Sequence, residues 1–228
     1  MKNGGGFPLK LFDIIGPVMT GPSSSHTAGA VKIGLVSRAL LGSTPARAEI
    51  LLHGSFAQTG RGHGTDRALV AGLLGMRPDD PRIPESFSYA EEAGLSFDFQ
   101  TGSLKNVHPN TARLTLWDKK GNRLEVVASS LGGGRIQICR VDGIDIGFSG
   151  GSNTLIVHNE DKPGCAALVT ALLAKFQLNI ATIQLCRNFP GGYAVMVIEC
   201  DQHIPAQLAE QLEKTEGIVR VTRLNLDV

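Results

Sequence analysis

The sequence predicts an α+β fold in two domains, because three patterns coincide. Small, flexible residues at 148–152 separate two regions of different character. After this junction, the apolar periodicity follows the order strand, helix, strand, strand, helix, strand, which is a ferredoxin-like split unit. Before it, helix patterns precede two hairpin patterns, without a repeat or a series of strand–helix–strand units. We therefore place the domains at 10–148 and 153–228.

The first domain is predicted to begin with two helices that flank a strand. We expect a helix at 27–41 ended by Gly42, a strand at 48–53, and a helix at 65–74 that Thr65 caps and Gly75 ends. The segment 78–110 is rich in proline, glycine and polar residues, so we expect it to be largely irregular. Two hairpins follow, at 113–117 with 124–128 and at 136–141 with 144–148.

The second domain contains each element of the split unit in turn. A β-branched strand at 154–157 leads into a turn at 161–164, where Pro163 suits the first turn of a helix. The remaining elements are a helix at 165–176, strands at 179–186 and 193–199, a helix at 204–215 and a strand at 218–226.

Composition indicates an ordinary soluble protein. The chain has 228 residues, of which 42% are hydrophobic and 19% charged, and its net charge is +1. This balance gives no electrostatic case for binding nucleic acid or a membrane surface. No apolar run approaches the roughly 18–20 residues of a membrane span, and the first eight residues lack an apolar signal core. We expect a cytoplasmic protein.

The cysteine pattern argues against a metal centre on this chain. The four cysteines are Cys139, Cys165, Cys186 and Cys200, and no pair is close enough to form a C-x-x-C motif. Zinc and iron–sulfur sites usually take at least two ligands from one tight turn. We expect reduced, mostly buried thiols and no metal ligands.

The densest polar cluster lies at 21–29, where three serines and His26 precede a helix. A helix N-terminus offers unpaired N–H groups and positive potential, so this loop is suited to hold a carboxylate or phosphate. The alternative is that Ser25 or Thr27 simply caps the helix.

A second candidate is the loop at 60–67, in which glycines flank His63 before another helix. Glycine lets backbone and substrate approach closely, and an exposed imidazole can act as a general base at neutral pH. The alternative is a flexible polar loop.

Three further segments are weaker signals. His108-Pro109-Asn110 precedes a strand, and Gly132-Gly133-Gly134 follows one. The segment 159–164 could close over a small amino acid, although its residues also suit a plain turn between strand and helix. The chain has neither a phosphate-binding G-x-x-x-x-G-K-[ST] motif nor a G-x-G-x-x-G motif.

Four ordered motifs resemble those of the beta region of iron–sulfur-dependent L-serine dehydratases. They are Phe12-Asp13-Ile14-Ile15-Gly16-Pro17 running into Gly21-Pro22-Ser23-Ser24-Ser25-His26-Thr27, then Gly60-Arg61-Gly62-His63-Gly64-Thr65-Asp66, His108-Pro109-Asn110 and Leu131-Gly132-Gly133-Gly134. Residues 153–228 resemble an ACT domain. The layout is similar to the two-chain type of this family, whose catalytic cysteines lie on a separate alpha chain.

The resemblance implies that the chain is the beta subunit of an L-serine ammonia-lyase, which converts L-serine to pyruvate and ammonia. It implies a [4Fe–4S] cluster on the alpha chain that acts as a Lewis acid on the serine hydroxyl. We assign the base to His63, with His26 and His108 as positioning or proton-shuttling residues. The predicted substrate-binding residues are Ser24, Ser25, Thr27, Thr65, Asp66, Asn110 and Gly133.

The ACT resemblance implies self-association and amino-acid binding, with Asn159, Asp161, Gly164 and Asn179 as candidate effector residues. It also implies a role in activation by K⁺, for which the sequence shows no motif. The first domain resembles the allosteric substrate-binding domain of some phosphoglycerate dehydrogenases, so serine could be substrate, effector or both. Two alternatives to a catalytic subunit are a purely regulatory amino-acid sensor and a scaffold for the alpha chain.

Overall fold

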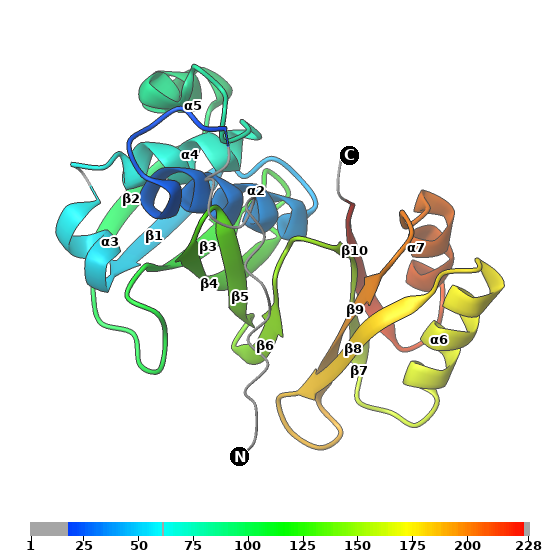
Figure 1. Cartoon of the computed structure of the whole chain (residues 1–228). Coiled ribbons are helices and arrows are strands. Elements are labelled where there is room, and N and C mark those ends of the chain that lie inside the picture. The colour runs from blue at the N-terminus through cyan, green and yellow to red at the C-terminus, as the bar shows by residue number, and fades with distance from the viewer. Residues whose placement is uncertain (1–17, 61, 226–228) are drawn as a thin grey trace, which may run out of the picture.

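Two β-sheets, each with helices packed on one face, organise the chain (Figure 1). They are seen in a computed structural model that describes residues 18–60 and 62–225. The first sheet ends at Phe148 and the second begins at Asn153, on either side of the small-residue junction. No helix within those two ranges has the length and hydrophobicity that crossing a bilayer requires. The α+β prediction is confirmed, while residues 10–17 and 226–228 of the predicted domains lie outside the described residues.

The first sheet has the strand order β2-β1-β3-β4-β5-β6, in which β1 and β2 are parallel and the other neighbours antiparallel. The strands are β1 (Arg47–His53), β2 (Ser96–Thr101), β3 (Thr111–Trp117), β4 (Arg123–Gly132), β5 (Arg135–Val141) and β6 (Ile144–Phe148). Both predicted hairpins are present. A π-helical turn, η1 (Ser24–Ala28), runs directly into the helix α2 (Gly29–Leu41), which Gly42 ends in a left-handed conformation.

Helix α2 and helix α4 (Thr65–Leu74) lie side by side over this sheet (Figure 1). They meet at Gly34 and Gly72, where the two backbones come so close that no side chain would fit between them. The N-cap of α4 is Gly64, so the prediction that Thr65 caps this helix is wrong. Each helix begins directly after one of the predicted histidine loops, and the packing of the two helices therefore sets how those loops face each other.

The prediction that 78–110 is largely irregular is wrong. This segment contains a 3₁₀ turn, η2 (Ile83–Glu85), the helix α5 (Ser86–Ala93) and the strand β2. Phe87 of α5 packs against Phe97 of β2, with ring centroids 4.9 Å apart. Contacts between single aromatic residues stabilise these short elements. Such contacts leave no long apolar periodicity in the sequence, so the helix and the strand could not be recognised from it.

The second domain has the predicted βαββαβ order, with an antiparallel sheet of order β10-β7-β9-β8. Its elements are β7 (Asn153–Glu160), α6 (Cys165–Lys175), β8 (Ile180–Arg187), β9 (Tyr193–Cys200), α7 (Ala206–Glu213) and β10 (Ile218–Leu224). Helices α6 and α7 cover the face that points away from the first domain (Figure 1).

The opposite face of the second sheet packs against the first domain. Ile156, Val195, Val197 and Leu224 belong to the same buried hydrophobic cluster as the core of the first domain. Burying one such side chain is worth about 1.5–3 kcal/mol, so this contact holds the two domains together.

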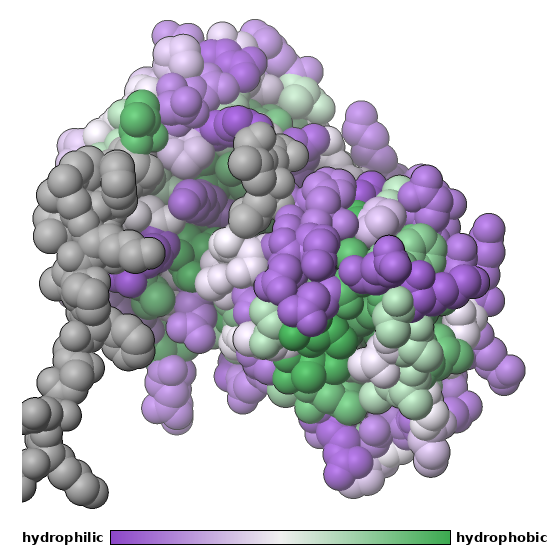
Figure 2. All heavy atoms as spheres, turned by 45° about the vertical axis from the view of Figure 1, so that its right-hand side comes forward, coloured by the Kyte–Doolittle hydropathy of each residue, from purple (hydrophilic) through white to green (hydrophobic). Residues whose placement is uncertain are grey.

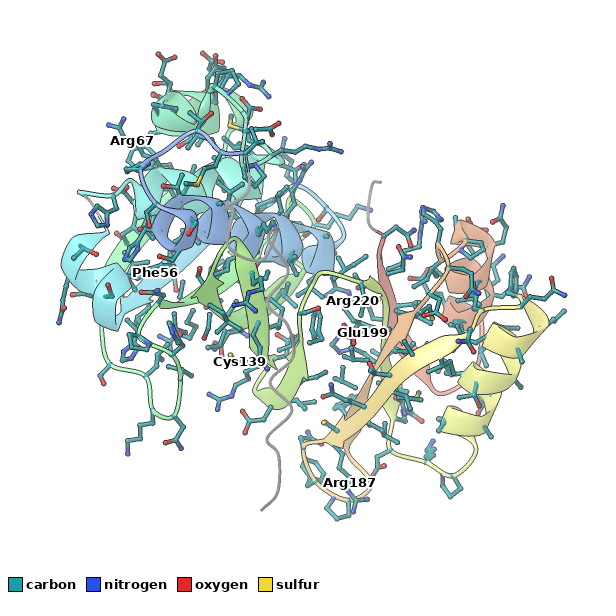
Figure 3. All side chains as sticks on the ribbon, viewed as in Figure 1. Phe56, Arg67, Cys139, Arg187, Glu199 and Arg220 are labelled. Atoms are coloured by element: carbon teal, nitrogen blue, oxygen red, sulfur yellow. The ribbon has the colours of Figure 1, made fainter. Side chains whose placement is uncertain are left out.

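Polar contacts from β10 reinforce this junction at the end of α2. The Arg220 guanidinium donates a hydrogen bond to the backbone carbonyl of Leu40, and the Thr222 hydroxyl lies 3.4 Å from the same oxygen. Arg220 lies between β10 and the first domain (Figure 3). A cation at a helix C-terminus also interacts favourably with the helix dipole.

Candidate functional site

The serine-rich loop folds back on itself at the start of η1. Ser23 is the N-cap residue, with extended backbone, and its side-chain oxygen accepts a hydrogen bond from the His26 backbone N–H at 3.1 Å. The alternative that Ser25 or Thr27 caps the helix is therefore wrong. Because Ser23 fills this role, the other hydroxyls of the loop are available for side-chain contacts.

His26 lies at the centre of a network of hydroxyl groups. Its Nδ1 is 3.1 Å from Ser25 Oγ and 3.4 Å from Ser23 Oγ. Its Nε2 is 3.0 Å from Thr59 Oγ1 and 3.2 Å from Ser55 Oγ. The side chain is buried, and burial lowers the pKa of His26 below 6.5, as does the neighbouring His63, while the Ser55 backbone raises it in part. A neutral imidazole fits this environment.

His63 is exposed and lies next to His26, with ring centroids 5.0 Å apart and planes at 85°. Its backbone is held on both sides: its N–H donates to the Thr59 carbonyl at 3.1 Å, and its carbonyl accepts from the Thr27 hydroxyl at 3.3 Å. The structure thus brings the two predicted histidine loops together and leaves one imidazole free to reach solvent.

A hollow of about 470 Å³ opens in front of His63. Its lining includes Thr27, His63, Asp66, Arg67, Pro84 and Phe87. Figure 3 shows Arg67 at the outer side of this part of the first domain. The hollow is large enough for a small amino acid, and its walls carry both charges and an aromatic ring.

The glycine-rich turn after β4 meets the serine loop. Gly132, Gly133 and Gly134 have positive φ angles of 87°, 61° and 72°, a backbone conformation that favours glycine. The Gly133 backbone N–H lies 3.3 Å from Ser24 Oγ, although 109 positions separate the two residues in the chain. Two of the predicted substrate-binding residues are therefore neighbours.

Other predicted residues lie apart from this centre. His108 is exposed and lines a different hollow, of about 480 Å³, together with Asn106, Cys139, Asp145 and Gln184. Its Nδ1 accepts a hydrogen bond from the Asn110 backbone N–H at 3.1 Å.

Thr65 is fully buried, and its hydroxyl has no hydrogen-bond partner within the described part of the chain. The structure therefore does not place Thr65 on the surface of the hollow, unlike Asp66 beside it.

The candidate effector residues divide between the two ends of the second sheet. Asn159, Asp161 and Gly164 lie at the end of β7 and the start of α6. Asn179 precedes β8 at the opposite end, where its amide donates to Asp201 at 2.6 Å. One copy of the domain does not bring all four residues together.

Ser55 and Thr59 are contact residues of His26 that the sequence analysis missed. Both lie on α3 (Gly54–Thr59), a short helix that follows β1 and was not predicted. Their spacing of four positions and their place directly after a buried strand are the signals that could have identified them, because residues four apart share one helix face.

Two family models match most of the chain. A family model described as "Serine dehydratase beta chain" matches residues 10–93, and one described as "ACT domain" matches residues 153–217. The probable L-serine dehydratase beta chain of Bacillus subtilis (strain 168) is 44% identical over 214 residues, which cover 94% of this chain and 97% of that protein. The chain belongs to the family of L-serine dehydratase beta chains.

Two further relatives are similar to this chain, and the first of them is also a beta chain. The L-serine dehydratase beta chain of Peptoniphilus asaccharolyticus is 40% identical over 198 residues, covering 86% of this chain and 89% of that protein. D-3-phosphoglycerate dehydrogenase of Bacillus subtilis (strain 168) is 25% identical over 161 residues, covering 70% of this chain and 30% of that protein. The stretch of this beta chain that matches the first family model includes His26 and His63 and ends before His108.

The cysteines of this beta chain do not fit an iron–sulfur cluster. They lie on four different elements, β5, α6, β8 and β9. Among the residues that the structure describes, no three His, Cys, Asp or Glu side chains form a group that could hold a metal ion. Only Cys200 is buried, so the prediction of mostly buried thiols is wrong for the other three.

Proposed function

We propose that the chain contributes half of a shared active site that converts L-serine to pyruvate and ammonia in the cytoplasm, together with an alpha chain. The observation that carries the proposal is the exposed His63 imidazole, stacked edge-on against the buried His26 at the wall of a hollow. Within the described residues, the serine loop that carries His26 meets the glycine-rich loop that carries His63 at this place.

His63 is the proposed general base. It would remove the proton from the α-carbon of L-serine while hydroxide leaves from the β-carbon, and this proton and the hydroxide together make the water that is released. The resulting enamine tautomerises to an imine, and water hydrolyses the imine to pyruvate and ammonia. The buried, neutral His26 is suited to positioning, because its ring nitrogens already have hydroxyl partners.

Substrate binding is proposed for the serine loop and the glycine turn beside it. Ser24 and Ser25 offer hydroxyl groups, and the Gly133 backbone N–H lies next to Ser24. Thr27 lines the hollow, but its hydroxyl already donates to the His63 carbonyl. Asp66 lines the hollow, where its carboxylate would attract an ammonium group. We do not include Thr65, because its side chain is fully buried.

The alpha chain is the proposed location of the [4Fe–4S] cluster. The cysteines of this chain do not fit the cluster, and His63 is exposed at the wall of the hollow, where a partner chain could reach it. The cluster would supply a Lewis acid for the departing hydroxyl, and K⁺ remains the candidate activating cation.

The proposal predicts that L-serine turnover requires both chains. Pyruvate formation would be followed after anaerobic co-expression of this chain with the alpha chain, and with the alpha chain alone. We expect turnover only from the pair. Full turnover by the alpha chain alone, with this chain changing only the response to serine, would instead identify a regulatory subunit.

We also propose that the ACT domain self-associates through β8 and binds an amino acid at the interface. Strand β8 is an edge strand, and Ile183 and Leu185 on it are 46% and 53% exposed. Figure 2 shows hydrophobic surface on this domain. Unpaired edges with apolar side chains are favourable sites for strand pairing.

Antiparallel pairing of two β8 strands would bring the divided effector residues together. The start of one β8 would lie beside the end of the other, so that Asn179 of one copy faces Asp161 of the second. Asp161 already holds Arg187 at 3.1 Å, and its pKa is lowered by the Gly191 backbone N–H and by Arg187. Asn159 is 2% exposed and its side-chain oxygen has no hydrogen-bond partner in the described residues, so a second copy or a ligand would have to open this end of β7 to reach it.

Leu185→Glu is therefore expected to convert the chain from a dimer to a monomer in sedimentation velocity, because it places a charge at the pairing edge. Phe189→Glu is the matched control, since Phe189 is 60% exposed but lies in the turn after β8. Equal sedimentation of wild type and both variants would contradict self-association through β8.

A further inference from the structure

Thr59 connects His26 to the backbone of α3. Its Oγ1 lies 2.9 Å from the Ser55 carbonyl oxygen and 3.0 Å from His26 Nε2. A threonine hydroxyl has one proton to donate and lone pairs to accept. The Thr59 hydroxyl donates to the Ser55 carbonyl, the shorter of its two contacts, and a proton placed there leaves the Thr59 oxygen to accept from the ring. His26 then carries its hydrogen on Nε2.

The other side of the ring follows from this assignment. A neutral imidazole with hydrogen on Nε2 has an accepting lone pair on Nδ1. The Ser25 hydroxyl, 3.1 Å away, donates to that lone pair. Ser23 Oγ, which already accepts from the His26 backbone, lies 3.3 Å from Ser25 Oγ and can direct its own proton there.

The result is a chain of hydrogen bonds that all point the same way, from Ser23 through Ser25, His26 and Thr59 to the carbonyl of Ser55. Hydrogen bonds in such a series polarise and strengthen one another. Because the Ser25 hydroxyl donates its proton to His26, the half-buried Ser25 oxygen can offer only lone pairs to a ligand. An acceptor recognises a cationic amine and disfavours a carboxylate.

We propose that Thr59 is a positioning residue that holds His26 in the Nε2–H tautomer and so makes Ser25 an acceptor for the ammonium group of the amino-acid substrate. The role of Ser25 in binding the ammonium group rests on the proposed function, whereas the His26 tautomer can be measured on this chain alone. The assignment separates Ser24 from Ser25: Ser24 lies at the Gly133 N–H, and Ser25 belongs to the hydrogen-bond chain.

The tautomer is tested first, by imidazole ¹⁵N NMR of the full-length chain at pH 7.5, with His26→Gln to assign the His26 signals. We expect a neutral ring with hydrogen on Nε2 in the wild type and in Thr59→Ser. In Thr59→Val, which replaces the hydroxyl by a methyl group, we expect the tautomers to mix. A ring with hydrogen on Nδ1, or a charged ring, in the wild type would overturn the proposal without any need for activity.

The consequence for substrate is tested in the two-chain enzyme. We expect Thr59→Val to raise the KM for L-serine about tenfold, or about 1.4 kcal/mol, with a smaller change in kcat, because Ser25 no longer acts only as an acceptor for the ammonium group. Thr59→Ser, which keeps the hydroxyl, should restore KM. An unchanged KM together with an unchanged His26 tautomer in Thr59→Val would refute the role of Thr59. An inactive wild-type pair would count against the proposed function, while the NMR result would still decide the tautomer.

Discussion

His63→Ala is expected to lower kcat of the two-chain enzyme by roughly a hundredfold or more, because proton transfer by a positioned side chain contributes about 10²–10⁴-fold to a rate. His63 is the exposed member of the histidine pair. The edge of one ring contacts the face of the other, and the hydroxyl groups around His26 do not bond to the His63 ring among the described contacts. Removal of the imidazole therefore deletes a base while the serine loop keeps its contacts. Pyruvate formation should be measured at saturating L-serine, with the iron and sulfide content of the pair checked.

Two histidine variants serve as controls for this measurement. His203→Ala changes an exposed histidine of the second domain and should leave kcat unchanged. His108→Ala is more informative, since His108 lines a separate hollow beside Cys139 and Gln184. We expect it to keep most of the activity. Near-normal kcat in His63→Ala, with only the serine response altered, would show that the chain is regulatory.

Gly34→Ala is expected to lower the free energy of unfolding by about 2–3 kcal/mol, since an added methyl group in a well-packed interior forces backbone shifts. A Cβ at Gly34 would lie 2.9 Å from the Cα of Gly72, and closer still to the carbonyl oxygen of Leu69. Both obstacles are backbone atoms of α4, which cannot rotate away. At an exposed helix position the same change would raise the free energy of unfolding by about 1 kcal/mol. The sign of the measured change therefore shows whether Gly34 lies in a close contact between the two helices.

Urea denaturation of the full chain measures this effect, with Gly151→Ala as the matched control. Gly151 has an ordinary φ, and an added Cβ would meet only Ser149 Oγ, at 3.5 Å. Wild-type stability in Gly34→Ala would mean that α2 and α4 can separate at little cost. Because His26 precedes α2 and His63 precedes α4, loss of this contact should also reduce serine turnover.

The second domain could be predicted almost completely from the sequence, because its information is local. Each strand and helix carries its own periodicity, and Pro163 and Gly164 mark the turn between β7 and α6. The segment 78–110 was predicted poorly for the opposite reason. Helix α5 is short, and it is stabilised by the contact of Phe87 with Phe97 across the fold.

At the candidate site, residue types and the helices that follow both histidine loops could be predicted from the sequence. The resemblance implied that Ser24 and Gly133 bind substrate; that role stays a prediction, although the two residues lie 3.3 Å apart. The burial of His26, the exposure of His63 and the separate hollow of His108 became visible in the folded chain alone. The same is true of the contacts of Ser55 and Thr59 with the His26 ring. The physical reason is that burial and hydrogen-bond partners depend on how α2, α3 and α4 pack over one sheet, and residue spacing along the chain does not encode that packing.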